Sequence, residues 1–329
     1  MVNITSLDKS KNSRSGFLGA SKEEERKKVR KVLGLIFGLT LLGIGLATLS
    51  REWANWWGWL AQPKTILSEK KEIRPLTATP TPKVWGIRPV VLEMIKPLKG
   101  KYGVYFEDLE NKESFEINGK EVFTAASLIK LPVILALYRE NEAGRINLDE
   151  VYRLQEKDKR SGAGSLQYKP AGFEISYRRL AELMGKQSDN TAFNVVAQRL
   201  GAENIQKLID DLGMRGTVFA TNKTTPEDVG IFFRKLFKEK IVYEKDKEEI
   251  LSFLTETIFE DRIPAGVPAG VKVAHKVGTE VGVISDAGIV FDKKPFILVI
   301  LSEDVNELEA KKILPEIAKK IYEMRQEGN

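Results

Sequence analysis

The sequence predicts an α/β domain of the α+β type, with an antiparallel sheet flanked by terminal helices and joined to an all-helical subdomain. Residues 102–106 and 114–117 alternate apolar and polar side chains about the polar turn 109–113, which is the pattern of a β-hairpin. Near the end of the chain, apolar β-branched segments return after a long helical block. Strands from both ends around a helical middle favour one shared sheet, with a cleft where the sheet meets the helices.

The elements follow one another without an internal repeat, beginning with a helix at 90–98 that precedes the hairpin. The middle of the domain is mostly helical, and Thr224-Thr225-Pro226 opens one of its helices. The helices expected in this block include 128–141, 177–186, 191–200, 202–212 and 226–238. The three strands and the helix expected after it are 272–277, 283–291, 296–302 and 305–326.

A transmembrane helix is predicted before the folded domain. Residues 32–50 form an almost unbroken apolar run, which at about 1.5 Å per residue can cross a bilayer core of about 30 Å. Basic residues crowd into 26–31, and tryptophans crowd into 53–59. Positive charge before the span and an aromatic belt after it place the N-terminus in the cytoplasm and the folded domain outside. The alternative is a cleaved signal peptide with Gly45-Leu46-Ala47 as its small-residue site.

The other segments outside the folded domain are expected to be a tail and a tether. Residues 1–31 are interpreted as a basic cytoplasmic tail, and 51–86 as a tryptophan-rich interface segment and a proline-rich linker, which leaves 87–329 as the domain. The net charge is +6, but its basic residues are densest beside the predicted span, where anionic lipid explains them. A nucleic-acid partner is therefore not expected, and the sequence does not set the oligomeric state.

Composition excludes several kinds of chemistry. The chain has no cysteine and a single histidine, His275, so thiol catalysis and disulfides are impossible. Neither a metal site nor a cofactor is expected from this composition. A Ser-His-Asp triad would have to use His275, which we interpret instead as a strand-end residue beside the site.

Ser127-Leu128-Ile129-Lys130 is the strongest candidate reaction centre. Residues three apart share a helix face, so the amine of Lys130 can reach the hydroxyl of Ser127. A serine hydroxyl is a poor nucleophile until a neighbour takes its proton, and a desolvated lysine beside another cation can serve as that base. An isolated S-x-x-K pattern is weak evidence for a catalytic site. Two further motifs accompany it here, Ser188-Asp189-Asn190 and Lys276-Val277-Gly278-Thr279.

Together the three motifs resemble those of the class A β-lactamase family and of penicillin-binding proteins. The resemblance runs from about Gly103 to the C-terminus. It includes the segments Phe123-Thr124-Ala125-Ala126, Thr224-Thr225-Pro226 and Ala265-Gly266-Val267-Pro268. It implies a β-lactamase/transpeptidase-like fold and an acyl-enzyme mechanism.

The resemblance also implies a role for the residues of the first two motifs. Ser127 would be acylated, and Lys130 would be its base or the electrostatic partner of a water that acts as base. Ser188 would pass a proton to the leaving nitrogen, and Asn190 would bind a substrate amide and orient Lys130. Asp189 is expected to hydrogen-bond the turn backbone rather than to react.

The third motif is expected to bind substrate. Lys276, with Gly278 and Thr279, would hold a substrate carboxylate, and Lys276 would also polarise Ser188. The backbone N–H groups of Ser127 and Thr279 would form an oxyanion hole. Upstream of the second motif, Tyr168 and Lys169 belong either to the cleft wall or to a surface loop.

Two departures from the family pattern affect the expected chemistry. Val277 stands where the family usually has threonine or serine, so one hydroxyl near the carboxylate is missing. Residues 213–223 run almost directly from one helix to the next, which leaves out the loop whose glutamate activates the deacylating water. Glu227, Asp228 and Glu280 are candidate substitutes, although carboxylates at helix starts usually serve the helix dipole.

The favoured hypothesis is a membrane-anchored, extracytoplasmic serine hydrolase resembling class A β-lactamases, acylated at Ser127 by β-lactams or related amides and possessing weak β-lactam hydrolysis. The first alternative is a penicillin-binding D,D-peptidase or transpeptidase acting on cell-wall peptide, which the tether and the missing glutamate both suit. The second is a catalytically silent module with the same fold, against which the intact motifs argue. The expected partner is accordingly a β-lactam or a D-Ala-D-Ala-like peptide.

Overall fold

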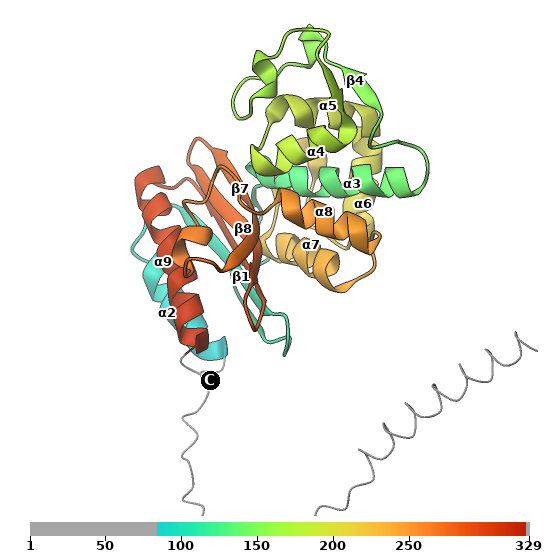
Figure 1. Ribbon diagram of the computed structural model, residues 1–329. Coiled ribbons are helices and arrows are strands. Elements are labelled where there is room, and N and C mark those ends of the chain that lie inside the picture. The colour runs from blue at the N-terminus through green and yellow to red at the C-terminus, as the bar shows by residue number, and fades with distance from the viewer. Residues whose placement is uncertain (1–83, 327–329) are drawn as a thin grey trace, which may run out of the picture. The chain divides into compact units, whose positions relative to one another are not determined.

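The computed structural model describes residues 84–326, and its centre is a five-stranded antiparallel sheet in the order β2-β1-β9-β8-β7 (Figure 1). The strands are β1 (Lys101–Asp108), β2 (Ser114–Ile117), β7 (Lys272–Glu280), β8 (Val283–Phe291) and β9 (Phe296–Glu303). Strands β1 and β9 pair along their whole lengths, from Lys101 opposite Glu303 to Asp108 opposite Phe296. The two ends of the domain therefore share one sheet, as the sequence predicts.

Helices from the two ends of the domain cover one face of this sheet. Helices α2 (Val84–Ile95) and α9 (Glu307–Gln326) lie side by side on it (Figure 1). Their apolar residues, such as Val91 and Ile317, join Phe106 and Ile300 of the sheet in one buried cluster. Because the other face is covered as well, β8 is buried along almost its whole length, which explains its largely apolar sequence.

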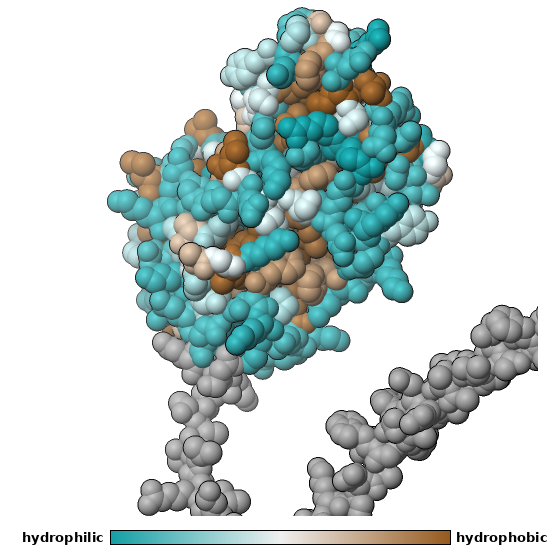
Figure 2. Space-filling view, in the orientation of Figure 1, coloured by the Kyte–Doolittle hydropathy of each residue, from teal (hydrophilic) through white to brown (hydrophobic). Residues whose placement is uncertain are grey.

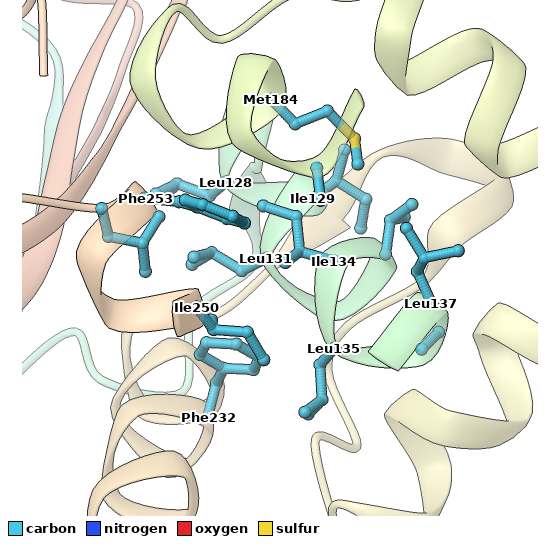
Figure 3. Close-up of a cluster of buried hydrophobic side chains, with 14 of the residues drawn as sticks. Leu128, Ile129, Leu131, Ile134, Leu135, Leu137, Met184, Phe232, Ile250 and Phe253 are labelled. Carbon is cyan, nitrogen blue, oxygen red and sulfur yellow. The ribbon is translucent and has the colours of Figure 1, made fainter. Parts of the chain in front are cut away.

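The other face of the sheet packs against the helical subdomain. Its helices are α3 (Lys130–Glu142), α4 (Tyr177–Lys186), α5 (Asn190–Leu200), α6 (Ala202–Asp211), α7 (Pro226–Lys238) and α8 (Glu244–Phe253). Helix α3 is buried on every side from Lys130 to Tyr138, as a central core helix must be. Figure 3 shows its leucine and isoleucine side chains meeting Met184 of α4, Phe232 of α7 and Ile250 of α8. The helix that carries Lys130 is thus rigidly supported.

Hydrophilic residues cover most of the surface in the view of Figure 2, and hydrophobic residues show only in separate, smaller patches over both the sheet and the helical subdomain. Two short antiparallel pairs complete the described chain. Strand β3 (Phe123–Thr124) pairs with β6 (Lys223–Thr224), and β4 (Val151–Arg153) pairs with β5 (Glu174–Ser176). Neither these pairs nor α8 was predicted, because two- and three-residue strands carry no measurable period and α8 buries only Asp246, Ile250 and Phe253.

The predicted tail (1–31) and transmembrane helix (32–50) lie outside the described residues, as does almost all of the predicted linker (51–86). Within residues 84–326, no helix is both long enough and apolar enough to span a bilayer.

Candidate active site

Ser127 lies on a short 3-10 turn, η1 (Ala126–Ile129), between β3 and α3. The expected helix 128–141 is therefore in two parts, and Lys130 is the first residue of α3. Side chains three residues apart lie directly above one another in a 3-10 turn, so the Lys130 side chain lies over that of Ser127. The turn begins with Ala126 in the left-handed region, at φ 47°, a strained conformation that persists only where the surroundings hold it. Ala126 is buried, and the residues packed around it stabilise this conformation.

The Lys130 ammonium is enclosed by neutral hydrogen-bond acceptors. Its Nζ lies 3.0 Å from Ser127 Oγ, 2.6 Å from the carbonyl oxygen of Ser188, 3.2 Å from Ser188 Oγ and 2.7 Å from Asn190 Oδ1. The ring centroid of Phe193 lies 5.7 Å from the same nitrogen. Burial lowers the pKa of Lys130 to about 8, against the opposing charges of Asp189 and Glu280. At pH 7 roughly one Lys130 in ten is then neutral and able to accept a proton.

The second motif brings Ser188 and Asn190 to Lys130. Ser188 adopts a left-handed conformation, at φ 54°, immediately before α5. Asp189 caps that helix, because its carboxylate accepts the backbone N–H of Ala192 at 2.8 Å and that of Leu166 at 2.8 Å. This position agrees with the structural role expected of Asp189. Asn190 presents its oxygen to Lys130 and donates its Nδ2 to the carbonyl of Ser161 at 2.9 Å.

Lys276, on β7, reaches the same serine hydroxyl from the sheet. Its Nζ donates to Ser188 Oγ at 2.9 Å and to the carbonyl of Val277 at 3.2 Å. Burial and then the positive charge of Lys130 hold the pKa of Lys276 well below its ordinary value. The Ser188 hydroxyl therefore bridges two lysines, which is an arrangement through which a proton can pass.

Gly278 and Thr279 line the turn that carries Ser127. A Cβ atom on Gly278 would lie 3.0 Å from the carbonyl oxygen of Ala125, so glycine lets β7 approach that turn closely. The Thr279 side chain is exposed, and its hydroxyl accepts Nη2 of Arg262 at 2.6 Å. Arg262 was not identified from the sequence. It is buried, and its Nη1 also donates to the carbonyls of Gly278 at 3.1 Å and Ser285 at 2.5 Å.

His275 lies beside Lys276 in the sequence but does not join the reaction centre. It is buried in the middle of β7 rather than at the strand end, and its Nδ1 lies 2.9 Å from Oδ1 of Asp286. Burial alone would lower the pKa of His275, but Asp286 and Glu260 raise it to about 9, so the imidazole is protonated near neutral pH. None of the hydrogen bonds of His275 within the described chain reaches Ser127. Residues 84–326 also contain no cluster of three or more potential metal-binding side chains.

The connection between α6 and α7 is short, as the sequence predicts. It contains the 3-10 turn η4 (Phe219–Thr221) and β6, and the Phe219 ring packs on Phe193 with 6.2 Å between centroids. Phe193 in turn lies against Lys130, so this loop adds aromatic surface beside the reaction centre. It contains no carboxylate between Gly213 and Lys223.

The three candidate substitute carboxylates lie in different surroundings. Asp228 is buried and accepts Gly216 N at 2.8 Å and Thr217 Oγ1 at 2.7 Å, so it serves the start of α7. Glu227 lines a surface groove with Arg88 and Arg234 rather than the reaction centre. Glu280 is the one of these three carboxylates whose negative charge acts on Lys130, where it raises the pKa of the amine. Its Oε1 accepts Nδ2 of Asn222 at 3.1 Å.

Tyr168 and Lys169 belong to an exposed loop, and the Tyr168 side chain is 81% exposed. Leu166, in the same 3-10 turn as Tyr168, donates its backbone N–H to Asp189 at 2.8 Å, so this turn borders the second motif while the Tyr168 side chain lies at the surface. The structure thus joins Ser127, Lys130, Ser188, Asn190 and Lys276 in one set of hydrogen bonds.

Solved structures with this fold include PBP-A, which is 26% identical, with a TM-score of 0.71 and coverage of 76% of this chain and 100% of that chain. A point mutant of PBP-A in an acyl-enzyme complex with penicillin G has the same identity and TM-score, over 75% of this chain and 99% of that chain. A β-lactamase from Sphaerobacter thermophilus is 25% identical, with a TM-score of 0.70 over 74% and 97%. Comparison with curated protein sequences finds no match. A model of the beta-lactamase enzyme family matches residues 88–324, which include all five strands of the sheet and the three motifs, and the chain therefore belongs to that family.

Proposed function

We propose that the protein is a serine hydrolase that forms an acyl-enzyme at Ser127 with β-lactams or related amides. The observation that carries this proposal is the buried Nζ of Lys130, 3.0 Å from Ser127 Oγ and with a pKa lowered to about 8. A base is most effective when its pKa lies near the working pH, which this lysine satisfies. The penicillin G complex of the PBP-A mutant supports β-lactams as acylating ligands.

In the proposed acylation, neutral Lys130 takes the proton of Ser127 as Oγ bonds to the amide carbonyl carbon. The backbone N–H groups of Ser127 and Thr279 receive the developing oxyanion. Ser188 then donates its proton to the leaving nitrogen as the C–N bond breaks, and it recovers the proton held by Lys130. Support for this relay comes from Ser188 Oγ, which lies 3.2 Å from Lys130 Nζ and 2.9 Å from Lys276 Nζ.

The proposed substrate carries a carboxylate near the reacting bond. Lys276 and Arg262 are both buried beside Gly278, and Arg262 donates to the hydroxyl of the exposed residue Thr279, which brings its charge to the rim of the site. A hydrogen bond between ionised groups is about twice as strong as a neutral one, so this rim favours anionic ligands. β-Lactams and peptides that end in D-Ala-D-Ala share such a carboxylate.

Hydrolysis of the acyl-enzyme is proposed to be slow. It needs a base aimed at a water molecule, and the short loop brings the Phe219 ring against Phe193 and contains no carboxylate. Of the carboxylates considered, Asp228 and Glu227 are placed elsewhere and only Glu280 acts electrostatically on the lysine. The same observation favours the second candidate function, a penicillin-binding D,D-peptidase or transpeptidase, because a transpeptidase passes its acyl group to an amine instead of to water.

Intact-protein mass spectrometry after incubation with benzylpenicillin tests the proposal. The protein should gain the mass of one penicillin, Ser127→Ala should gain none, and the exposed-serine control Ser252→Ala should behave as wild type. Covalent label that survives in Ser127→Ala would reject Ser127 as the nucleophile, and an unlabelled wild type would favour the catalytically silent module. Turnover of a chromogenic cephalosporin, compared with release of D-Ala from a D-Ala-D-Ala peptide, then separates the two enzyme candidates.

Anchoring in the cell membrane through residues 32–50 is part of the proposal, supported by the apolar run and the basic residues before it. The full chain should remain with membranes after alkaline carbonate extraction, and a variant that lacks residues 1–50 should be released. Release of both proteins would contradict the anchor and favour the cleaved signal peptide.

A further inference from the structure

A carboxylate is buried behind the strand that carries Lys276. Asp286, on β8, has no exposed surface and is the cross-strand partner of Val277. Because successive side chains of a strand point to opposite faces, Asp286 and Val277 lie on the face opposite to Lys276. That is the face covered by α9. A buried charge is costly unless it is paired and hydrogen-bonded, so its partners show what holds it there.

Asp286 is fully engaged by hydrogen-bond donors. Its Oδ1 accepts Nδ1 of His275 at 2.9 Å and the backbone N–H of Ala287 at 2.9 Å. Its Oδ2 accepts the backbone N–H of Ile263 at 3.0 Å. Burial lowers the pKa of both Arg262 and Lys276, and the negative charge of Asp286 acts against that lowering at each. One buried anion therefore acts on His275, Arg262 and Lys276 together, and Glu260 and Asp261 add negative charge beside His275 and Arg262.

These contacts also fasten the segment that carries Arg262. The Asp286 bond fixes Ile263, the residue that follows Arg262. At the other end of the segment, Nε2 of His275 lies 3.3 Å from Thr257 Oγ1 and 3.3 Å from Glu260 Oε1. The segment 257–263 is thus held at both ends by one histidine–aspartate pair, with the Arg262 guanidinium directed to Thr279 and Gly278.

We propose that Asp286, paired with His275, is a positioning residue for substrate carboxylate recognition: it holds the segment that carries Arg262, whose guanidinium is hydrogen-bonded to Thr279 and Gly278. The inference rests on the proposed function. Without the Asp286 charge, among the carboxylates of the described residues the buried Arg262 would keep only Asp261, whose Oδ1 lies 3.9 Å from its Nε, and His275 would keep only Glu260. We expect the segment that carries Arg262 to be displaced in response, which weakens the attraction of the site for an anion. The contacts of Ser127 with Lys130 do not involve Asp286, so the acylation step itself is preserved.

The test compares benzylpenicillin with its uncharged methyl ester as acylating agents of the full chain. Asp286→Asn keeps the shape of the side chain and removes its charge. We expect it to lower the second-order acylation rate with benzylpenicillin by about 10- to 100-fold, the range for losing hydrogen bonds to a charged group. Saturation kinetics should place this loss in the apparent affinity rather than in the limiting rate. Acylation by the methyl ester should change less than about threefold. Asp211→Asn, a matched change on the surface of α6, should leave both reactions unchanged.

Three outcomes would overturn the inference. Equal losses with the acid and the ester would show that Asp286 serves the fold alone, and unchanged acylation by benzylpenicillin would show that it does not act on the rim. If neither compound acylates the wild type, the proposed function fails and this inference falls with it, which is distinct from failure of Asp286→Asn alone. If the melting temperature of Asp286→Asn lies below the assay temperature, the same ratio measured for His275→Gln decides the matter, with the same selective loss expected.

Discussion

Replacing Asn190 with aspartate should turn the base of the site into a permanently protonated lysine at neutral pH. Asn190 Oδ1 lies 2.7 Å from Lys130 Nζ, and no carboxylate within the described residues is hydrogen-bonded to that nitrogen. Asn190→Asp would therefore put a negative charge in direct contact with the ammonium without changing the size of the side chain. An opposite charge within 4–6 Å typically moves a pKa by about 1 to 3.

The size of the effect follows from the lowered pKa of Lys130, which is about 8. At pH 7 about one lysine in ten is neutral, and each further pKa unit lowers that fraction about tenfold. Asn190→Asp should accordingly slow acylation at pH 7 by about 10- to 1000-fold and move the half-maximal pH from about 8 to about 9 or above. The sign is fixed because the neutral lysine is the reactive form, so raising its pKa shifts activity toward alkaline pH.

The assay is the rate of acylation by benzylpenicillin between pH 6 and 10, followed by intact mass. Asn190→Asp also loses the bond from Nδ2 to Ser161 O, which is 2.9 Å long. Asn190→Ala loses that bond without adding charge, so its half-maximal pH should stay at or below the wild-type value. Asn147→Asp, an exposed side chain whose oxygen accepts a backbone N–H, controls for the charge change itself. A profile of Asn190→Asp that coincides with that of Asn190→Ala would refute Lys130 as the titrating base.

Four further measurements test other parts of the argument. Lys130→Ala should slow acylation by at least about 100-fold at unchanged melting temperature, and a rate within a few fold of wild type would remove its role as base. Stopped-flow traces with a chromogenic cephalosporin should show a product burst near one equivalent of enzyme and then slow turnover, because the absence of a positioned base costs about 10² to 10⁴ in the rate of deacylation. Fast turnover without a burst would contradict this and make Glu280→Gln the next variant to measure. The pKa of His275 is raised from 6.5 to about 9, so protonated His275 adds about 3 kcal/mol to the free energy of unfolding below pH 6.5, and this contribution is lost as the pH rises toward 9. In denaturant unfolding, the stability of the wild type should therefore fall from pH 6.5 to 8. An equal fall in His275→Gln would contradict this. Gly278→Ala should slow acylation by roughly tenfold, because its Cβ would press on the Ala125 carbonyl at 3.0 Å and shift the serine turn, and wild-type kinetics would show that the turn absorbs the contact.

The sequence predicts the strands of the sheet and shows the three motifs directly, because strands and motifs are both local patterns of residues. Helix 177–186 and strand 283–291 have the predicted bounds, since each carries a clear apolar period and ends at polar or glycine-rich segments. The 3-10 turn at Ala126–Ile129 is not predicted, because a left-handed backbone at alanine is rare and nothing in the local sequence indicates it. Whether the motif residues have the proposed roles is a separate matter, which the experiments above decide.

Arg262 and Asp286 show what a linear pattern cannot reveal. Arg262 reaches Gly278 across 16 residues of chain, and Asp286 meets His275 across a strand pair, so neither contact follows from spacing. The face of the sheet on which His275 lies could have been deduced from the sequence. Once Lys276 is assigned to a strand and directed into the cleft, its neighbour must point to the opposite face. That period-two rule separates the single histidine from the serine without any knowledge of its aspartate partner.

The charge balance of the site connects its chemistry to its ligand. Lys130 and Lys276 are hydrogen-bonded only to neutral oxygens within the described residues, and the carboxylate that balances Lys276, Asp286, lies on the opposite face of the sheet. A carboxylate in contact with Lys130 would hold its proton and prevent it from acting as a base, so neutral acceptors are the arrangement that allows it to be partly neutral near pH 7. Burial among neutral acceptors thus lowers the pKa of Lys130, and in the proposed function an anionic substrate would be bound by the cations of the same site.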